Sequence, residues 1–529
     1  MIGIERKYRI VMLVISGMLT SFALILPRVG FIQWVSIIPA ALVIMDIAED
    51  RDIKLRNIYG YGLCFFMSYY LVIYHWFWYM YPLDFAGLNE IASLAVVCVA
   101  WIGLSLLQTV GGAFVFVLFA AVSRLAIFNK NKILMPLMAA AIWTVSEWAQ
   151  TIGWWGVPWG RLCLGQTNAL LLLRSASVLG TYFVTFVIVA VNFFLAYALS
   201  CKEKRRIASV CAICIFGINA ALGAIVTVRY KNEGEPVKVA AVQGNISSTD
   251  KWSGGAEKIL EIHAKYTREA AKNGARVVVW SETALPYNFF KNERIHSFVS
   301  ALARECNVTI LVSTFTEYEN NSWQLQNSLI EVCPDGNFGE DMYFKQRLVP
   351  FGEFVPMRRL VEIIFPPLSE IGMLQEDLIA GEESTVIQTD AGRFGCGICF
   401  DSIYEDLIRE SVLGGAQIIA ISTNDSWFAD SAALYMHNSQ SVLRAIENGR
   451  YVVRSANTGI SSIIDPMGNL NVSLPANEEG YITDNVSMRD HLTVYTVIGN
   501  IFVYICAAAV CVSFCAEWII KRRDNMKQL

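Results

Sequence analysis

Long apolar runs separated by short charged segments fill the first 230 residues, and one more run lies near the end of the chain. The runs occupy residues 9–27, 31–47, 59–81, 92–122, 134–152, 174–200, 207–229 and 494–516. Most are close to the ~20 residues that a helix needs to cross ~30 Å of hydrocarbon. The pattern therefore predicts a multi-pass α-helical membrane domain with about eight spans.

The composition supports this prediction. Of the 529 residues, 55% are apolar and 17% are charged, which is too apolar for a water-soluble domain of ordinary charge content. The first run lacks a small-residue cleavage site, so we expect a retained anchor rather than a removed signal peptide. A net charge of −4 gives no indication of nucleic-acid binding.

Positive charges between the runs predict the orientation, because Lys and Arg in short loops stay on the cytoplasmic side. They gather at both ends of the chain and after every second run: Arg6, Lys7 and Arg9; Arg51, Lys54 and Arg56; Arg124, Lys130 and Lys132; Lys202, Lys204, Arg205 and Arg206; Lys521, Arg522, Arg523 and Lys527. We expect a protein of the cytoplasmic (inner) membrane with both termini in the cytoplasm. Residues 236–487 would then face the periplasm or the exterior.

Residues 236–487 alternate strand-like runs with segments of helical periodicity. The strand-like runs are bounded by Gly, Asn or Asp and cover 237–242, 276–280, 309–313, 327–332, 393–400 and 417–422. Helical spacing of apolar residues covers 254–273, 292–305, 402–413 and 431–449. We predict a seven-span domain over 1–235, a layered α/β catalytic domain over 236–487, and an eighth span with a basic tail over 488–529.

Three ionisable residues stand at the ends of apolar runs in the α/β block. Glu282 follows the run 276–280, Lys345 follows residues 342–344, and Cys399 lies near the end of the run 393–400. Taken singly, each has an ordinary interpretation: a solvated turn, a surface lysine and a buried inert thiol. Together they supply a base, a cation for an oxyanion and a nucleophile, which are the parts that acyl transfer through a thiol needs.

Other chemistries have weaker support. Cys396 and Cys399 form a C-x-x-C, but no second pair or histidine cluster completes a zinc site, so we expect no metal. We also expect no cofactor, and the cysteines show no disulfide framework. A Cys-His or Ser-His-Asp arrangement is disfavoured because the five histidines lie in no nucleophile motif: His75, His263, His296, His437 and His491.

The residues around the trio make the chain similar to a known family. Trp280-Ser281-Glu282-Thr283, Lys345 with Leu348-Val349-Pro350-Phe351-Gly352-Glu353, and Gly397-Ile398-Cys399-Phe400-Asp401 resemble the nitrilase superfamily. Over nearly its whole length the chain resembles the apolipoprotein N-acyltransferases, the membrane-embedded branch of that superfamily. Further matching strings are Gln243-Gly244-Asn245, Lys251-Trp252, Val157-Pro158-Trp159-Gly160 and Arg454-Ser455-Ala456-Asn457-Thr458-Gly459.

The resemblance implies a nitrilase-like αββα domain and a ping-pong N-acyltransferase. Glu282 would be the general base, Lys345 the oxyanion-stabilising cation and Cys399 the nucleophile. A phospholipid would give its acyl chain to Cys399 as a thioester, and the N-terminal S-diacylglyceryl cysteine of a lipoprotein would receive it as an amide. Supporting residues would be Glu353, Trp252, Phe400, Asp401, Trp159 and Asn457. We expect a monomer that contacts membrane lipids and no nucleic acid.

Some features leave alternatives open. The family usually has Tyr then Glu after the cysteine, whereas Phe400 and Asp401 lack the phenol hydroxyl and shorten the carboxylate's reach. Lys345 should favour the thiolate of Cys399. Residues 354–368 are either a mobile arm that dips into the outer leaflet or an ordinary core loop. A membrane-tethered amidase with water as acceptor shares the trio. A transporter would explain the spans, although they carry few internal charges.

Overall fold

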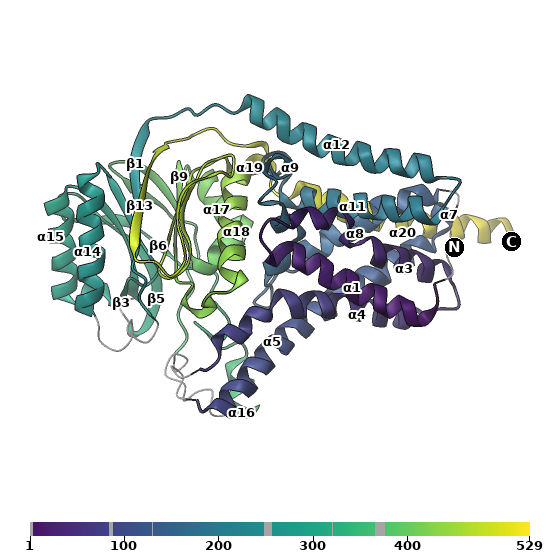
Figure 1. Ribbon diagram of the computed structural model, residues 1–529, viewed down its shortest axis with the longest axis horizontal. Helices are drawn as coiled ribbons and strands as arrows, with labels where there is room; N and C mark the ends of the chain where they lie inside the picture. Colours follow the sequence, from purple (N-terminus) through teal and green to yellow (C-terminus); the bar gives the residue numbers. More distant parts are fainter. Residues whose placement is uncertain are drawn as a thin grey trace. The chain divides into compact units, whose positions relative to one another are not determined.

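The computed structural model describes residues 4–83, 88–129, 131–247, 256–319, 321–364 and 376–528. The chain forms two compact units (Figure 1). The first contains Met1–Phe77, Cys98–Arg229 and Ile498–Leu529, and the second contains Trp78–Val97 and Tyr230–Val497. The domain boundaries predicted at 235 and 487 stay a prediction.

Helices occupy all the apolar runs. Among the described residues, six helical segments are long and apolar enough to cross a membrane. They are formed by α1 (Arg6–Ile25), α2 and α3 (Gln33–Ser36, Ile38–Glu49), α5 and α6 (Glu90–Gly112, Phe114–Ser123), α11 (Thr181–Ser200), α12 (Arg205–Arg229) and α20 (Ile501–Gln528). Two further helices, α4 (Leu55–Ile73) and α8 (Met135–Ala149), fill the remaining predicted runs. The count of eight spans stays a prediction.

Small residues and hydroxyl groups bring the first helices of the helical unit close together. A Cβ at Gly17 of α1 would lie 2.5 Å from the carbonyl oxygen of Phe65 in α4. The Ser21 hydroxyl donates to the carbonyl oxygen of Tyr69, also in α4, at 2.8 Å. Such close contacts are typical of helix packing in membranes, where burial of apolar surface contributes little to association.

The second unit contains two sheets. The larger has the order β13-β1-β2-β4-β5-β6, with β3 paired to β4. Its strands are β1 (Pro236–Gln243), β2 (Val277–Trp280), β3 (Leu285–Asn288), β4 (Thr309–Tyr318), β5 (Asn321–Val332), β6 (Phe338–Phe344) and β13 (Gly480–Ser487). The smaller has the order β12-β11-β10-β9-β8-β7. Its strands are β7 (Val386–Thr389), β8 (Gly392–Ile398), β9 (Ile418–Thr423), β10 (Val452–Ala456), β11 (Ser461–Ile464) and β12 (Leu470–Leu474).

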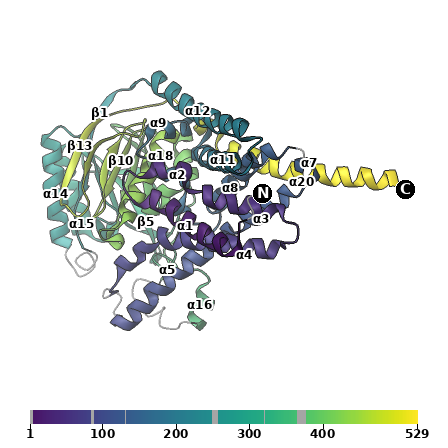
Figure 2. The ribbon, with the colours of Figure 1, turned by 45° about the vertical axis from the view of Figure 1, so that its right-hand side comes forward.

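Apolar side chains of both sheets meet in one core, exemplified by Val239, Val279, Phe394 and Ile418. Helices α14 (Ala256–Lys272) and α15 (Glu293–Cys306) cover the outer face of the larger sheet and lie side by side in Figure 2. Helices α17 (Glu405–Leu413) and α18 (Ala432–Asn448) pack against the smaller sheet. The layers therefore run α-β-β-α, which confirms the predicted architecture of this part of the chain.

The strand ends position the functional side chains. Strands β1, β2 and β4 are parallel neighbours, as are β8, β9 and β10. Glu282 follows β2 by two residues, and Cys399 directly follows β8, which ends at Ile398 rather than at residue 400. Ligand sites of α/β domains commonly form at the carboxyl ends of parallel strands.

Candidate active site

The predicted lysine lies between two carboxylates. Lys345 follows β6, and its Nζ donates to Oε1 of Glu282 and to Oε1 of Glu353, each at 2.8 Å. Only 1% of the lysine side chain is exposed. The structure therefore brings together two members of the predicted trio and the additional carboxylate, although 63 residues separate Glu282 from Lys345.

Amide groups complete the hydrogen bonds of the two carboxylates. Asn327, in β5, donates from Nδ2 to Oε1 of Glu282 at 2.9 Å and to Oε1 of Glu353 at 3.3 Å. The backbone N–H of Asn424 donates to Oε2 of Glu282, and that of Val349 donates to Oε2 of Glu353, both at 2.8 Å. Asn327 and Asn424 were not predicted from the sequence. For Asn424, its place just after a strand-like run was the available signal.

Lys345 supplies one positive charge to two carboxylates, those of Glu282 and Glu353. Burial works against a charged ammonium, but the carboxylates of Glu282 and Glu353 outweigh burial and hold the pKa of Lys345 well above its ordinary value. If Glu282 accepts a proton, Lys345 and Glu353 remain as a neutral pair. The arrangement can therefore take up a proton at Glu282 without leaving an unpaired buried charge.

Cys399 occupies a strained turn between β8 and the short helix η10 (Cys399–Ile403). Its φ is +50°, in the left-handed region, which a residue with a side chain adopts at a cost of ~1 kcal/mol or more. Burial and, next, the charge of Glu282 raise the pKa of the Cys399 thiol above its ordinary value. Lys345 opposes this shift, as predicted, but is outweighed, so the resting thiol keeps its proton.

Asp401 connects the turn that carries the thiol to the segment that carries the lysine. Its Oδ2 accepts from the Ile398 N–H at 3.1 Å and from the Tyr343 hydroxyl at 2.8 Å. Its Oδ1 accepts from the N–H groups of Gln346 and Arg347 at 3.2 and 2.8 Å. The shorter side chain thus still makes four contacts. Phe400, beside it, packs edge-to-face against Tyr404 with ring centroids 5.5 Å apart.

The other predicted supporting residues lie in three different situations. Asn457 donates from Nδ2 to the carbonyl oxygen of Ile246 at 2.7 Å and to Oδ1 of Asn424 at 3.1 Å, so it holds a neighbour of Glu282. Trp159 belongs to the helical unit, where it is buried with its ring centroid 6.1 Å from that of Trp76. Trp252 lies outside the described residues.

The predicted arm falls only partly within the described residues. Helix α16 (Arg358–Ile364) forms its middle, and residues 365–368 lie outside the described part of the chain. Arg358, the first residue of this helix, is paired with Asp377. The mobile arm stays a hypothesis.

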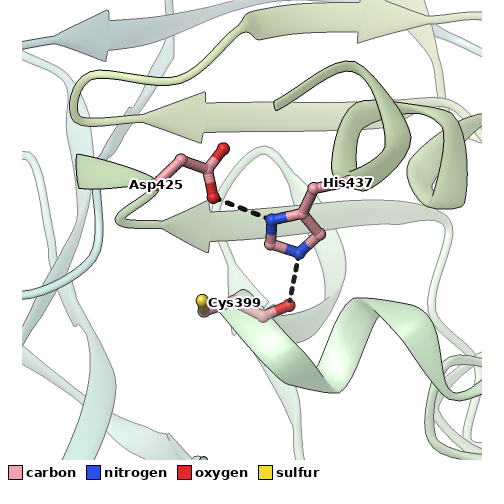
Figure 3. A group of neighbouring side chains, drawn as sticks. All are labelled: Cys399, Asp425 and His437. Atoms are coloured by element: carbon pink, nitrogen blue, oxygen red, sulfur yellow. Dashed lines mark hydrogen bonds and ion pairs between the residues drawn. The ribbon is translucent and has the colours of Figure 1, made fainter. Parts of the chain in front are cut away.

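A histidine and an aspartate that the sequence analysis did not single out lie next to Cys399 (Figure 3). One ligand-type atom from each of Cys399, Asp425 and His437 lies within 4.8 Å of the others. Both oxygens of Asp425 already accept hydrogen bonds, from His437 Nδ1 at 2.7 Å and from Arg454 at 2.8 Å. The group is therefore a hydrogen-bonded network rather than a set of vacant ligands. Cys396, the other half of the C-x-x-C, is buried in the core between the sheets.

Both parts of the chain match known sequence families. Residues 238–491 match "Carbon-nitrogen hydrolase" and residues 16–194 match "Apolipoprotein N-acyltransferase N-terminal domain". The chain is 31% identical to an apolipoprotein N-acyltransferase of Geobacter metallireducens, covering 70% of this chain and 72% of that one. It is 28% identical to one of Gloeobacter violaceus, covering 90% and 88%. A solved carbon-nitrogen hydrolase of Helicobacter pylori covers 51% of this chain and 95% of its own length, at 17% identity and a TM-score of 0.40.

Proposed function

Because this chain belongs to the apolipoprotein N-acyltransferase family, it is an acyltransferase that acts on lipoproteins, and we propose that Cys399 carries the acyl chain between two substrates. The donor is a phospholipid, and the acceptor is the N-terminal S-diacylglyceryl cysteine of a lipoprotein. The observation that carries the proposal is the buried ammonium of Lys345, held between Glu282 and Glu353 within electrostatic reach of the Cys399 thiol.

In the first half-reaction, the Cys399 sulfur attacks the carbonyl carbon of a phospholipid ester while Glu282 accepts the thiol proton. The ammonium of Lys345 stabilises the negative charge that develops on the carbonyl oxygen. The ester C–O bond then breaks, the lysophospholipid leaves with the proton from Glu282, and the acyl chain remains on sulfur as a thioester. The raised pKa of Cys399 fits this order, since the thiol gives up its proton only as it attacks.

In the second half-reaction, the α-amino group of the lipoprotein cysteine attacks the thioester. This amine has an ordinary pKa of ~8, so a useful fraction is neutral near pH 7. Glu282 accepts a proton from the attacking nitrogen, the C–S bond breaks, and Glu282 returns the proton to the departing sulfur, which restores the Cys399 thiol. The amide is more stable than the thioester, so transfer to nitrogen runs downhill.

The apolar helices and the family make this an inner-membrane protein. The second unit faces the periplasm or the exterior, where exported lipoproteins are found, and both termini lie in the cytoplasm. The alternation of Lys- and Arg-rich loops supports this orientation.

An amidase would use the same side chains with water as the acceptor, so the test is the fate of the acyl chain. Purified protein is incubated with labelled phospholipid, first alone and then with a diacylglyceryl cysteinyl peptide. We expect a thioester on Cys399 with lipid alone, and acyl-peptide amide once the peptide is added. Free fatty acid as the main product would favour the amidase, and no adduct on Cys399 would contradict the proposal.

Two cysteine variants make the test specific. Cys399→Ala should lower amide formation by ~10³-fold or more, because the nucleophile is lost. Cys396→Ser, three residues away and in the buried core, serves as the matched control and should still form the adduct.

A further inference from the structure

We infer that His437 is a positioning residue for acyl transfer: a buried imidazole that links Asp425 to the backbone carbonyl oxygen of Cys399 and so fixes the turn that carries the nucleophile. The inference rests on the proposed role of Cys399. His437 lies on α18, 38 residues after the cysteine, and its side chain is 1% exposed. It makes no contribution to the proton transfers proposed above, which use Glu282.

The imidazole connects an aspartate to the nucleophile turn. Nδ1 lies 2.7 Å from Oδ1 of Asp425, and Nε2 lies 3.2 Å from the backbone carbonyl oxygen of Cys399. Nε2 also lies 3.1 Å from the hydroxyl of Ser402. Figure 3 shows the ring between the carboxylate and the turn, with the carbonyl oxygen of Cys399, rather than its sulfur, facing Nε2.

The partners of each ring nitrogen determine where the protons are. A carbonyl oxygen can only accept, so Nε2 carries a hydrogen. The Ser402 hydroxyl donates its own hydrogen to that same carbonyl at 2.7 Å, so it too offers only an acceptor to Nε2. On the other side, Asp425 accepts from Arg454 and from the Thr423 hydroxyl. With a hydrogen on Nε2, the contacts of this nitrogen with the Cys399 carbonyl and the Ser402 hydroxyl each pair a donor with an acceptor.

The charge state of Asp425 agrees with this assignment. Burial alone would raise the pKa of its carboxyl, but His437 and Arg454 outweigh burial and hold that pKa below its usual range. Asp425 is therefore an ionised acceptor for Nδ1. The charged groups around the ring are Asp425 after β9, Arg454 in β10 and, beyond the thiol, Glu282 after β2.

The contact matters because Cys399 is held in a left-handed conformation. Such a conformation persists only where surrounding contacts fix it. The two donors to the Cys399 carbonyl, Ser402 Oγ and His437 Nε2, are such contacts. Without His437 the turn can relax and displace the thiol from Glu282 and Lys345. A displacement of ~1 Å in a reacting group can cost ~10²-fold in rate.

The test measures the rate of the first half-reaction and its dependence on lipid. In His437→Ala, acylation of Cys399 by phospholipid vesicles, followed by mass spectrometry, should slow by ~10²-fold at saturating lipid, with an unchanged lipid concentration at half-maximal rate. His437→Gln, which keeps one N–H donor for the Cys399 carbonyl, should recover part of the rate.

Control variants separate this role from a general loss of stability. His296→Ala, on the outer helix α15, should leave both readouts unchanged. Asp425→Asn should also slow acylation at saturating lipid, and the double variant should be no slower than the slower single variant, because both act through one contact. If His437→Ala does not fold, His437→Gln decides by its acylation rate at saturating lipid, which should lie below the parental rate.

A parental acylation rate in a folded His437→Ala variant would overturn the inference. Slowing in His437→Ala that His437→Gln does not relieve would also overturn it, since the lost contact would then not be the N–H donated to the Cys399 carbonyl. Failure of the proposed function is distinguishable, because the parental protein itself would then form no adduct on Cys399.

Discussion

Lys345 contributes both to the proposed reaction and to the stability of the site. It is the only cation among the described residues that both Glu282 and Glu353 contact, and all three side chains are at most 14% exposed. Two carboxylates that share Asn327 would repel each other strongly without it. The ammonium of Lys345 therefore offsets the repulsion between the carboxylates of Glu282 and Glu353.

We predict that Lys345→Met abolishes acylation of Cys399 and also lowers the free energy of unfolding by ~3 kcal/mol, because it leaves two buried carboxylates without a counter-charge. Thermal unfolding in detergent, followed by circular dichroism, measures the stability loss. Lys345→Met combined with Glu353→Gln should regain part of the stability but none of the activity. The control is Lys291→Met, an exposed lysine 3.5 Å from Glu317, which should change stability by less than ~0.5 kcal/mol. An unchanged melting temperature in Lys345→Met would contradict the prediction.

The family resemblance singled out Glu282, Lys345 and Glu353 by their roles, and the structure places them in contact. It could not identify Asp425 and His437 as neighbours of Cys399. Their contact depends on α18 folding back over the end of β8, and a single histidine at a helical position carries no sign of its partner in the linear sequence. The chemistry of each side chain can be predicted from its residue type. Which distant strand ends lie next to each other cannot be predicted from the linear sequence.

Contacts made by turn residues set the spacing between the turn that carries Cys399 and the segment that carries Lys345. Asp401 is the clearest case, since one buried carboxylate binds the end of β8 and the segment that follows β6. Strands β8 and β6 belong to different sheets, so this carboxylate sets the spacing between the nucleophile and the lysine. The strands 237–242 and 417–422 were predictable from alternating apolar residues and turn residues. Strands β3, β6, β7 and β10 to β13 were not predicted, because their short or partly polar sequences lack a clear pattern.

Asp401 predicts a pH dependence of the first half-reaction. Burial raises the pKa of this carboxyl to about 6, above its ordinary value. Because the folded state then binds the proton more tightly than the unfolded state, this group does not reduce stability as the pH falls from ~6 to ~4. When the Asp401 carboxyl is protonated, one of its oxygens carries a hydrogen. That hydrogen meets a group that is itself a donor, so at least one of the four hydrogen bonds to Asp401 is lost. Acylation of Cys399 should therefore slow with a midpoint near pH 6 while the melting temperature shows no parallel loss.

Acylation by phospholipid alone, measured by rapid quench and mass spectrometry between pH 5 and 8, isolates this effect from titration of the amine acceptor. Asp401→Asn should be slow throughout and show no midpoint near pH 6, since it cannot accept from all four donors at any pH. Asp401→Glu, which restores the residue type usual in the family, should keep the dependence. The same midpoint in Asp401→Asn would assign it to another group and contradict the prediction.

At the level of the whole molecule, the orientation depends on how many helices cross the membrane before the second unit. Five such segments precede it among the six that are long and apolar enough, and α4 and α8 would make seven. Either odd number places residues 236–487 opposite the N-terminus. The two counts differ in the loop around Arg124 and Lys132, which is cytoplasmic only if α4 crosses. The 19 residues of α4 extend ~28 Å, nearly the thickness of the hydrocarbon core. The positive charges therefore favour seven crossings.

Protease sites inserted into exposed turns test this orientation. A site between Asp335 and Gly336, in the turn from β5 to β6, should be cut by protease added outside intact spheroplasts. Sites placed after Lys202 and after Asn131 should be cut only once the membrane is permeabilised, because both loops carry the positive charges that are retained in the cytoplasm. Cleavage at residue 131 from outside, with protection at 202, would mean five crossings and leave the second unit outside. Protection at 335 would instead place the catalytic groups in the cytoplasm, away from exported lipoproteins, and would contradict the proposed orientation.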